Sequence, residues 1–223
     1  MSEEVKSMLR ELNRQGYITT IISSGDVQRL YQQIKNVDIH LIGQYGLQIA
    51  DIKNGELIII KDDKINAFDN TTQIAMKVSE FRKRSGFCDY VGRSFIINNA
   101  GFLIISLLGD ESNKELRNNF DPDQKKRKQY INLLKEIFPN TIINICGKTS
   151  YDVIDGKFCK YSALKSFCIS EGCDISQALF FGDQLYNETG NDYSIYYNNV
   201  DCVNVDDYRH IIDIVKSTLA KNL

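Results

Sequence analysis

The sequence predicts an α/β fold in which a parallel-sheet core is interrupted by a second unit of mixed α+β structure. Helix and strand patterns alternate over residues 3–60 and again from residue 160 onward, which is typical of a parallel sheet covered by helices. Between these stretches, helices and strands with short links indicate an antiparallel sheet. We therefore expect a Rossmann-like core from residues 1–65 and 157–223, with residues 66–156 inserted as a cap.

The first stretch opens with apolar residues at positions 5, 8, 9 and 12, a spacing that predicts a helix over residues 3–15. Asn54-Gly55 separates two apolar runs and predicts a β-hairpin. The remaining elements expected in this stretch are a strand at 19–22, a helix at 27–34 and a strand at 39–42.

The inserted stretch carries two strands joined at Asn99-Ala100-Gly101, and Asp121-Pro122 is expected to open a helix that ends near Phe138. The other elements expected here are a helix at 71–83 and strands at 141–146 and 150–154. After it we expect a helix at 161–171, a strand at 178–182, a short helix, a strand at 201–205 and a helix at 206–220.

Composition restricts the function classes. The net charge is −2, so no nucleic-acid or anionic-membrane partner is expected. No apolar stretch reaches the roughly 20 residues that span a bilayer, and the charged start shows no secretory signal, so we expect a cytoplasmic protein. The six cysteines form no CxxC motif and are expected to be reduced. The basic run 125–128 is expected to be a solvated helix face; attraction of a phosphorylated substrate, or RNA contact, is the alternative.

Polar residues follow or precede three of the predicted core elements. The apolar run at 179–181 ends in Gly182-Asp183, and Asn191-Asp192 follows a polar loop. Hard carboxylate ligands at the carboxyl end of a strand suit Mg²⁺, although a turn and a helix cap would use the same residues. Ser24 ends another strand and Lys160 opens a helix. Phosphoryl chemistry uses such a hydroxyl, lysine and metal together; the alternatives are a helix cap at Ser24 and a solvated Lys160.

These segments, in this order, resemble the haloacid dehalogenase (HAD) superfamily with a type IIB cap, and look closest to eukaryotic-type phosphomannomutases. IISSGD, KYSAL and FFGDQLYNETGND are similar to three of the family's motifs, and GKTSYDVIDGKFCK is similar to the end of the phosphomannomutase cap. The resemblance implies a role for each of the following residues: Ser24 and Gly25 at the phosphoryl group, Lys160 pairing with it, Asp183 binding Mg²⁺ with support from Asn191 and Asp192, and Ser150 and Asp152 facing the sugar. Ser150 and Asp152 could equally face water.

The family's nucleophilic aspartate, in a DxDxT segment on the first strand, is not found in this sequence. In the family that strand lies centrally, between the strands expected here at 19–23 and 178–182. Unpaired buried backbone groups cost about 1–3 kcal/mol each. We therefore expect one of three outcomes: the two flanking strands pair directly, another segment fills the slot, or the natural chain begins upstream.

The cap also departs from the phosphomannomutase pattern. Asn99 and Asp110 stand where arginines are expected to hold a second phosphate, which leaves Arg93 as the arginine of that stretch. The resemblance therefore implies a Mg²⁺-dependent phosphatase-like protein acting on a small phosphorylated metabolite, with a sugar phosphate as the expected substrate. The alternatives are a sugar phosphomutase and a catalytically inactive sugar-phosphate-binding module. If the chain assembles with itself, we expect a homodimer.

Overall fold

The computed structural model describes residues 1–220, and the chain divides into two compact units. The first unit contains Met1–Asp63, Cys159–Asn187 and the chain from Asp192 onward. The second unit contains Lys64–Phe158 and Glu188–Asn191. Each unit has its own sheets and its own hydrophobic core, and each is described separately below.

One sheet of the first unit has the order β1-β2-β3-β4. Its strands are β1 (Thr20–Ile22), β2 (Ile39–Gly43), β3 (Gln48–Lys53) and β4 (Glu56–Asp62). β1 and β2 are parallel, whereas β2, β3 and β4 pair antiparallel. Asn54 and Gly55 both have positive φ angles, of 53° and 79°, as a two-residue hairpin turn of the I′ type requires. The structure thus forms the hairpin at the predicted dipeptide.

The second sheet of the first unit consists of two parallel strands, β9 (Leu179–Gly182) and β10 (Asp201–Asn204). β1 and β9 belong to different sheets, and within residues 1–220 each pairs with a single neighbouring strand. All residues of both strands are only half-buried. Among the described residues, direct pairing of these strands and a substitute strand between them are therefore both absent.

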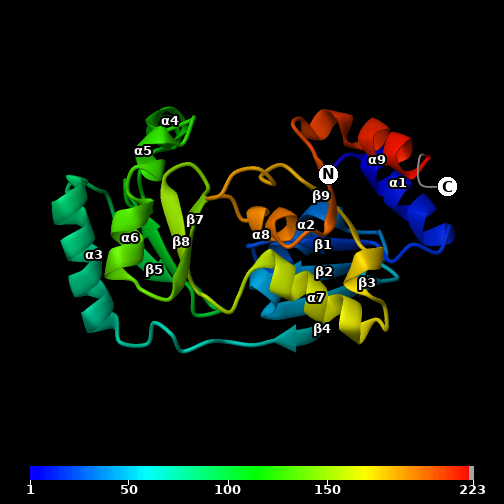
Figure 1. The fold of residues 1–223 in the computed structure, drawn as a ribbon, viewed down its shortest axis with the longest axis horizontal. Helices are drawn as coiled ribbons and strands as arrows, with labels where there is room; N and C mark the ends of the chain where they lie inside the picture. Colours follow the sequence, from blue (N-terminus) through cyan, green and yellow to red (C-terminus); the bar gives the residue numbers. More distant parts are fainter. Residues whose placement is uncertain (221–223) are drawn as a thin grey trace. The chain divides into compact units, whose positions relative to one another are not determined.

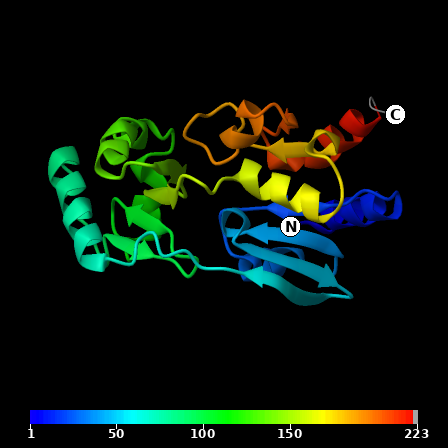
Figure 2. The ribbon, with the colours of Figure 1, turned by 60° about the horizontal axis from the view of Figure 1, so that its bottom comes forward.

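Helix α7 (Lys160–Ser170) packs on both sheets of the first unit. Its Phe167 packs with Ile42 of β2, and its Leu164 lies in a cluster that Phe180 of β9 joins. Figure 2 shows this helix, in yellow, between the two sheets in that view. The other helices are α1 (Glu3–Arg14), α2 (Val27–Ile34), α8 (Tyr193–Tyr197) and α9 (Ile211–Leu219), with 3-10 turns η1 (Gln44–Gly46), η2 (Ile175–Gln177) and η3 (Tyr208–His210). α1 and α9 contact each other (Figure 1).

The second unit contains a four-stranded antiparallel sheet with the order β5-β6-β8-β7, as predicted. Its strands are β5 (Phe95–Ile97), β6 (Leu103–Ser106), β7 (Thr141–Cys146) and β8 (Ser150–Asp155). Its helices are α3 (Thr71–Ser85), α4 (Lys114–Phe120), α5 (Lys125–Lys128) and α6 (Ile131–Ile137). Phe81 of α3 and Leu134 of α6 pack with Leu103, Tyr151 and Val153 of the sheet, so these two helices share one hydrophobic core with it.

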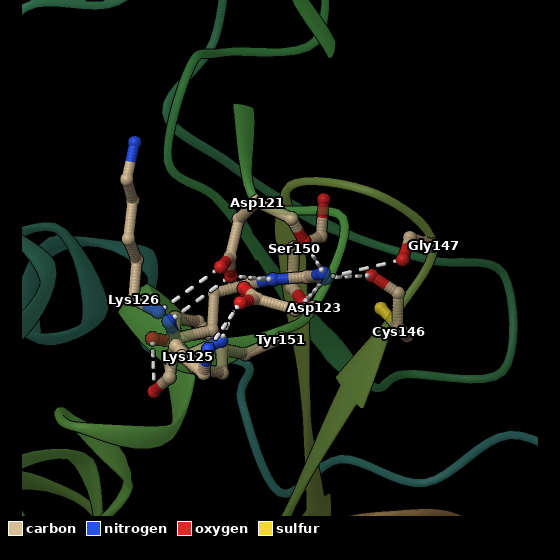
Figure 3. A network of polar contacts seen from close by, with 9 residues as sticks. Asp121, Asp123, Lys125, Lys126, Cys146, Gly147, Ser150 and Tyr151 are labelled. Atoms are coloured by element: carbon tan, nitrogen blue, oxygen red, sulfur yellow. Dashed lines mark hydrogen bonds and ion pairs between the residues drawn. The ribbon is translucent and has the colours of Figure 1, made fainter. Parts of the chain in front are cut away.

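The segment from Asp121 to Phe138 differs from the single helix that the sequence predicts. It forms α5 and α6, and Asp121 follows α4 instead of opening a helix directly. The Asp121 carboxylate accepts hydrogen bonds from the backbone N–H groups of Lys126 and Arg127 and pairs with the Arg127 guanidinium at 2.9 Å (Figure 3). These contacts hold Asp121 at the N-terminal end of α5.

Arg127 is 1% exposed, so the expected solvated face of the basic run is wrong for this residue. Its guanidinium also donates to the carbonyl oxygens of Cys146, the last residue of β7, and of Gly147. The Tyr151 hydroxyl donates to the carbonyl oxygen of Arg127 (Figure 3). Every nitrogen of the guanidinium therefore has a hydrogen-bond partner, and these bonds offset the free-energy cost of burying the charge. The pair attaches α5 to the sheet of the second unit.

Among residues 1–220, no helix has both the length and the apolar character needed to cross a bilayer.

Candidate functional site

Two of the predicted residues, Lys160 and Asp192, form a buried ion pair in the first unit. The Lys160 Nζ atom lies 2.5 Å from Asp192 Oδ1, and the two side chains are 10% and 2% exposed. Lys160 is the first residue of α7, where a cysteine side chain caps the helix, and Asp192 immediately precedes α8. The lysine is therefore not a solvated surface residue, because its ammonium group is held by a carboxylate from a distant loop.

Gly182 at the end of β9 lies directly against this pair. A Cβ atom at this position would lie 2.7 Å from Asp192 Oδ2 and 2.6 Å from a ring carbon of Phe180. The same Oδ2 atom accepts a hydrogen bond from the Gln184 backbone N–H at 3.2 Å. The strand end therefore needs glycine for a steric reason, and the backbone after it closes around Asp192.

Asp183 follows Gly182 and is exposed. Within residues 1–220 its carboxylate makes no hydrogen bond or ion pair. Asp192 differs from Asp183 because both of its carboxylate oxygens already have hydrogen-bond partners in the protein. Asp183 directly follows the strand end and, unlike Asp192, is free to bind a cation.

Ser24 and Gly25 follow β1, whose Ile22 packs against Leu164 and Ala163 of α7. The loop is fixed by two hydrogen bonds, from Gly25 N–H to Ser23 Oγ and from the Gln44 N–H to the Gly25 carbonyl oxygen. Ser23, not Ser24, thus stabilises the turn, which leaves the half-buried Ser24 hydroxyl outside this turn. The ends of β1 and β9 are both attached to the helix that Lys160 begins.

The side chains of the site offer few ligands for Mg²⁺. Among residues 1–220 there is no group of three His, Cys, Asp or Glu side chains that could hold a metal ion. Asn191 belongs to the short segment that groups with the second unit. Mg²⁺ commonly uses one or two carboxylates together with waters and substrate phosphates. Asp183 therefore fits a Mg²⁺ that is shared with a phosphate group, and does not by itself form a complete protein site.

The second unit holds Ser150 and Asp152 on β8. Asp152 is 8% exposed and lies opposite Asn144 of β7. The Cys146 thiol donates to Asp152 Oδ1 at 2.8 Å, and burial, followed by the charge of Asp152, raises the pKa of this thiol well above its ordinary value. Asp152 is therefore integrated in the sheet, whereas Ser150 lines a cavity of about 150 Å³.

Two arginines line the same cavity of the second unit. Arg93 is bound to Asp110, whose carboxylate accepts from the Arg93 backbone N–H and from its guanidinium, each at 2.7 Å. The acid found where an arginine was expected thus neutralises Arg93. Arg117 of α4 is half-buried, and its guanidinium makes no hydrogen bond or ion pair with the residues that the structure describes. Sequence reasoning missed Arg117; its position beside Ser150 depends on tertiary structure.

A further cavity of about 460 Å³ lies in the first unit at the start of β1 and β2, which is the opposite end from Ser24 and Gly43. Asp51, 5% exposed, binds His40 Nδ1 and Lys53 Nζ there, each at 2.7 Å. Burial raises the pKa of the Asp51 carboxyl, but the Lys53 hydrogen bond and the neighbouring His40 outweigh it, so the pKa lies below its ordinary value.

A family model described as eukaryotic phosphomannomutase matches residues 5–216. The chain belongs to the eukaryotic phosphomannomutase family. Its mixed α/β fold, with parallel and antiparallel sheets, is similar to that of the HAD structures reported below. No curated protein matches the sequence.

Solved structures that resemble this family member are distant in sequence, so they bear on the fold alone. Plasmodium falciparum IMP-nucleotidase is 13% identical with a TM-score of 0.62 over 93% of this chain and 60% of its own. A haloacid dehalogenase-like hydrolase from B. subtilis is 13% identical with a TM-score of 0.54 over 91% and 82%. A HAD subclass IIB sugar phosphatase is 13% identical with a TM-score of 0.52 over 87% and 76%. The chain spans 61% of the length of the IMP-bound nucleotidase structures.

Proposed function

We propose that this phosphomannomutase-family chain is a Mg²⁺-dependent, phosphatase-like protein that binds a small phosphorylated metabolite, and that a sugar phosphate is its ligand. The observation that carries the proposal is the buried Lys160–Asp192 pair, together with the unpaired carboxylate of Asp183 in the loop that leads from β9 to Asp192. Lys160 supplies a desolvated cation for phosphate oxygens, Ser24 supplies a hydroxyl, and Asp183 holds the metal. Asp192 orients Lys160.

When bound, Mg²⁺ neutralises charge on the phosphoryl oxygens. The chain's own residues do the rest. The Asp192 carboxylate restrains the lysine, and the hydrogen bond from the Gln184 N–H to Asp192 closes the loop that carries Asp183. The second unit is proposed as the cap, with Arg117 and Ser150 as its anion-binding groups. Arg93 is not proposed for this role because Asp110 already pairs with it.

A second candidate function is a sugar-phosphate-binding module without turnover. It is favoured because Asp192 is already committed to Lys160, Asp183 is proposed for the metal, and the sequence contains no DxDxT segment to supply a nucleophile. A sugar phosphomutase is the less favoured alternative, since Asp110 and Asn99 replace the arginines expected for a second phosphate.

Calorimetric titration of the 223-residue chain with inorganic phosphate, with and without Mg²⁺, tests the shared binding claim. We expect phosphate to bind more tightly with Mg²⁺, and Asp183→Asn to remove the Mg²⁺ dependence while Asp201→Asn, an exposed control, keeps it. Phosphate binding that ignores both Mg²⁺ and Asp183→Asn would contradict the proposal. Turnover of p-nitrophenyl phosphate then separates the two candidates: hydrolysis supports the phosphatase, and tight binding without hydrolysis supports the module.

A further inference from the structure

Two cysteines lie side by side where α7 ends. Gly172 has a positive φ angle of 71°, and its N–H donates to the Ile169 carbonyl oxygen at 3.2 Å. The Cys173 N–H donates to the Cys168 carbonyl oxygen at 3.0 Å. These two hydrogen bonds form a Schellman motif, which ends a helix at a left-handed glycine and commonly brings the side chains of the outer hydrogen-bonded pair into contact. In this chain both members of that pair are cysteines.

The two thiols are neighbours that differ in their access to solvent. The Cys173 Sγ atom lies 3.3 Å from the Cys168 carbonyl oxygen. Cys168 is 4% exposed, and the half-buried Cys173 packs against the same hydrophobic cluster. Burial, followed by the charge of Cys173 and a hydrogen bond with its side chain, raises the pKa of the Cys168 thiol to about 11. A reagent from solvent therefore reaches Cys173 first, and the Cys168 sulfur lies beside it.

The backbone geometry is compatible with a bond between the two sulfurs. A disulfide requires Cα atoms about 4.4–6.8 Å apart. The direct hydrogen bond from the Cys173 N–H to the Cys168 carbonyl oxygen, with standard bond lengths on either side of it, keeps the two Cα atoms within about 7 Å of each other. Packing alone would accept any small apolar side chains at these positions, because free cysteine behaves as a small hydrophobe. Two cysteines add a reaction that such side chains do not have.

We propose that Cys168 and Cys173 form a modification site, a dithiol that a small disulfide of the glutathione class converts into an intramolecular disulfide at the end of α7. The Cys173 thiolate attacks one sulfur of the oxidised reagent, so a mixed disulfide forms, the reagent's S–S bond breaks and one reduced thiol leaves with the proton. The Cys168 sulfur then attacks the Cys173 sulfur and expels the second reduced thiol, which takes the Cys168 proton. Two protein thiols are oxidised, and one reagent disulfide is reduced to two thiols.

The test equilibrates the 223-residue chain with mixtures of reduced and oxidised glutathione, in buffer and in urea, and then blocks the remaining thiols. Cleavage after Lys165 and Glu171 places Cys168 on the peptide 166–171 and separates it from Cys173. We expect the peptides that carry these two cysteines to be recovered joined by a disulfide. The yield at each glutathione ratio gives the effective concentration of the thiol pair, which we expect to be about tenfold higher in the folded chain than in urea.

Variants assign the bond to its two sulfurs. Cys173→Ser should abolish the joined product. Cys202→Ser is the matched control and should leave the product unchanged, because Cys202 is also half-buried and packs against the same hydrophobic cluster.

Several results would overturn the inference: both thiols remain free, the reaction stops at a glutathione adduct on Cys173, or Cys168 is joined to Cys202. An effective concentration in the folded chain no higher than in urea would also overturn it, because the folded geometry would then oppose the bond. None of these measurements involves phosphate or Mg²⁺, so their failure leaves the proposed function standing.

Discussion

Replacing Lys160 with methionine should be among the most damaging single changes in the first unit. The substitution keeps side-chain length and removes the cation that faces Asp192, whose side chain is 2% exposed. Asp192 would keep only the hydrogen bond from the Gln184 N–H. Removing one partner of a buried ion pair costs about 3–5 kcal/mol, because the remaining charge stays desolvated and uncompensated. Asp192→Asn should cost less, about 1–3 kcal/mol, because the amide oxygen of asparagine can still accept a hydrogen bond from the Lys160 ammonium group.

The loss of stability in Lys160→Met should be measured within the first unit, because the chain has two compact units and a global measurement would average over both. Native-state hydrogen exchange of the α7 amides reports the free energy of opening that part of the first unit. The double variant Lys160→Met/Asp192→Asn should be more stable than Lys160→Met alone, with a coupling of about 0.5–3 kcal/mol. A Lys160→Met protein within about 1 kcal/mol of the parent, or a double variant no better than Lys160→Met, would refute the buried-pair argument.

Three further predictions concern stability. Arg127→Met should destabilise the second unit by about 3–5 kcal/mol in urea unfolding, whereas Lys125→Met, in the same basic run but at an 80% exposed side chain, should change it by under about 1 kcal/mol; equal effects would contradict the burial argument. Asp51→Asn should be less stable than the parent at neutral pH. Because the folded pKa of Asp51 is lowered, its contribution is complete above its ordinary pKa, near 3.9, and is lost as pH falls through the folded value. If the difference in unfolding free energy between the parent and Asp51→Asn did not narrow at acidic pH, the assigned role of Asp51 would be wrong. Gly182→Ala should destabilise by about 1–3 kcal/mol through crowding, whereas Gly25→Ala, whose nearest neighbour lies at 3.4 Å, should be mild in a melting experiment; the reverse order would be incompatible with the geometry.

Local patterns determine much of this fold. The Asn54-Gly55 turn predicts its hairpin because both residues tolerate positive φ, and the apolar spacing of residues 5–12 predicts α1. The local sequence pattern did not predict that Arg127 is buried. An arginine among lysines looks solvated, and its burial depends on Asp121 and on carbonyl groups about 20 residues later in the chain. Such contacts leave no periodic signal in the sequence.

The candidate site shows the same division. Residue order along the chain indicates Lys160, Asp183 and Asp192, but only the structure shows that Lys160 pairs with Asp192 and that Asp183 is left unpaired. Arg117 was invisible because an isolated arginine in a polar helix has no distinguishing neighbours in sequence. Its relation to Ser150 arises when α4 and β8 come to line one cavity.

The two residues of the Gly182-Asp183 dipeptide have different roles, one structural and one chemical. The hydrogen of Gly182 is the only side group that leaves room for the carboxylate arriving from ten residues later. Selection for a correctly closed loop would therefore preserve this glycine even in a relative that had stopped turning over any compound. When such a dipeptide is used to search genomes, the glycine indicates the fold. The residue after it, whose carboxylate makes no hydrogen bond or ion pair within residues 1–220, is the one whose replacement would indicate altered chemistry.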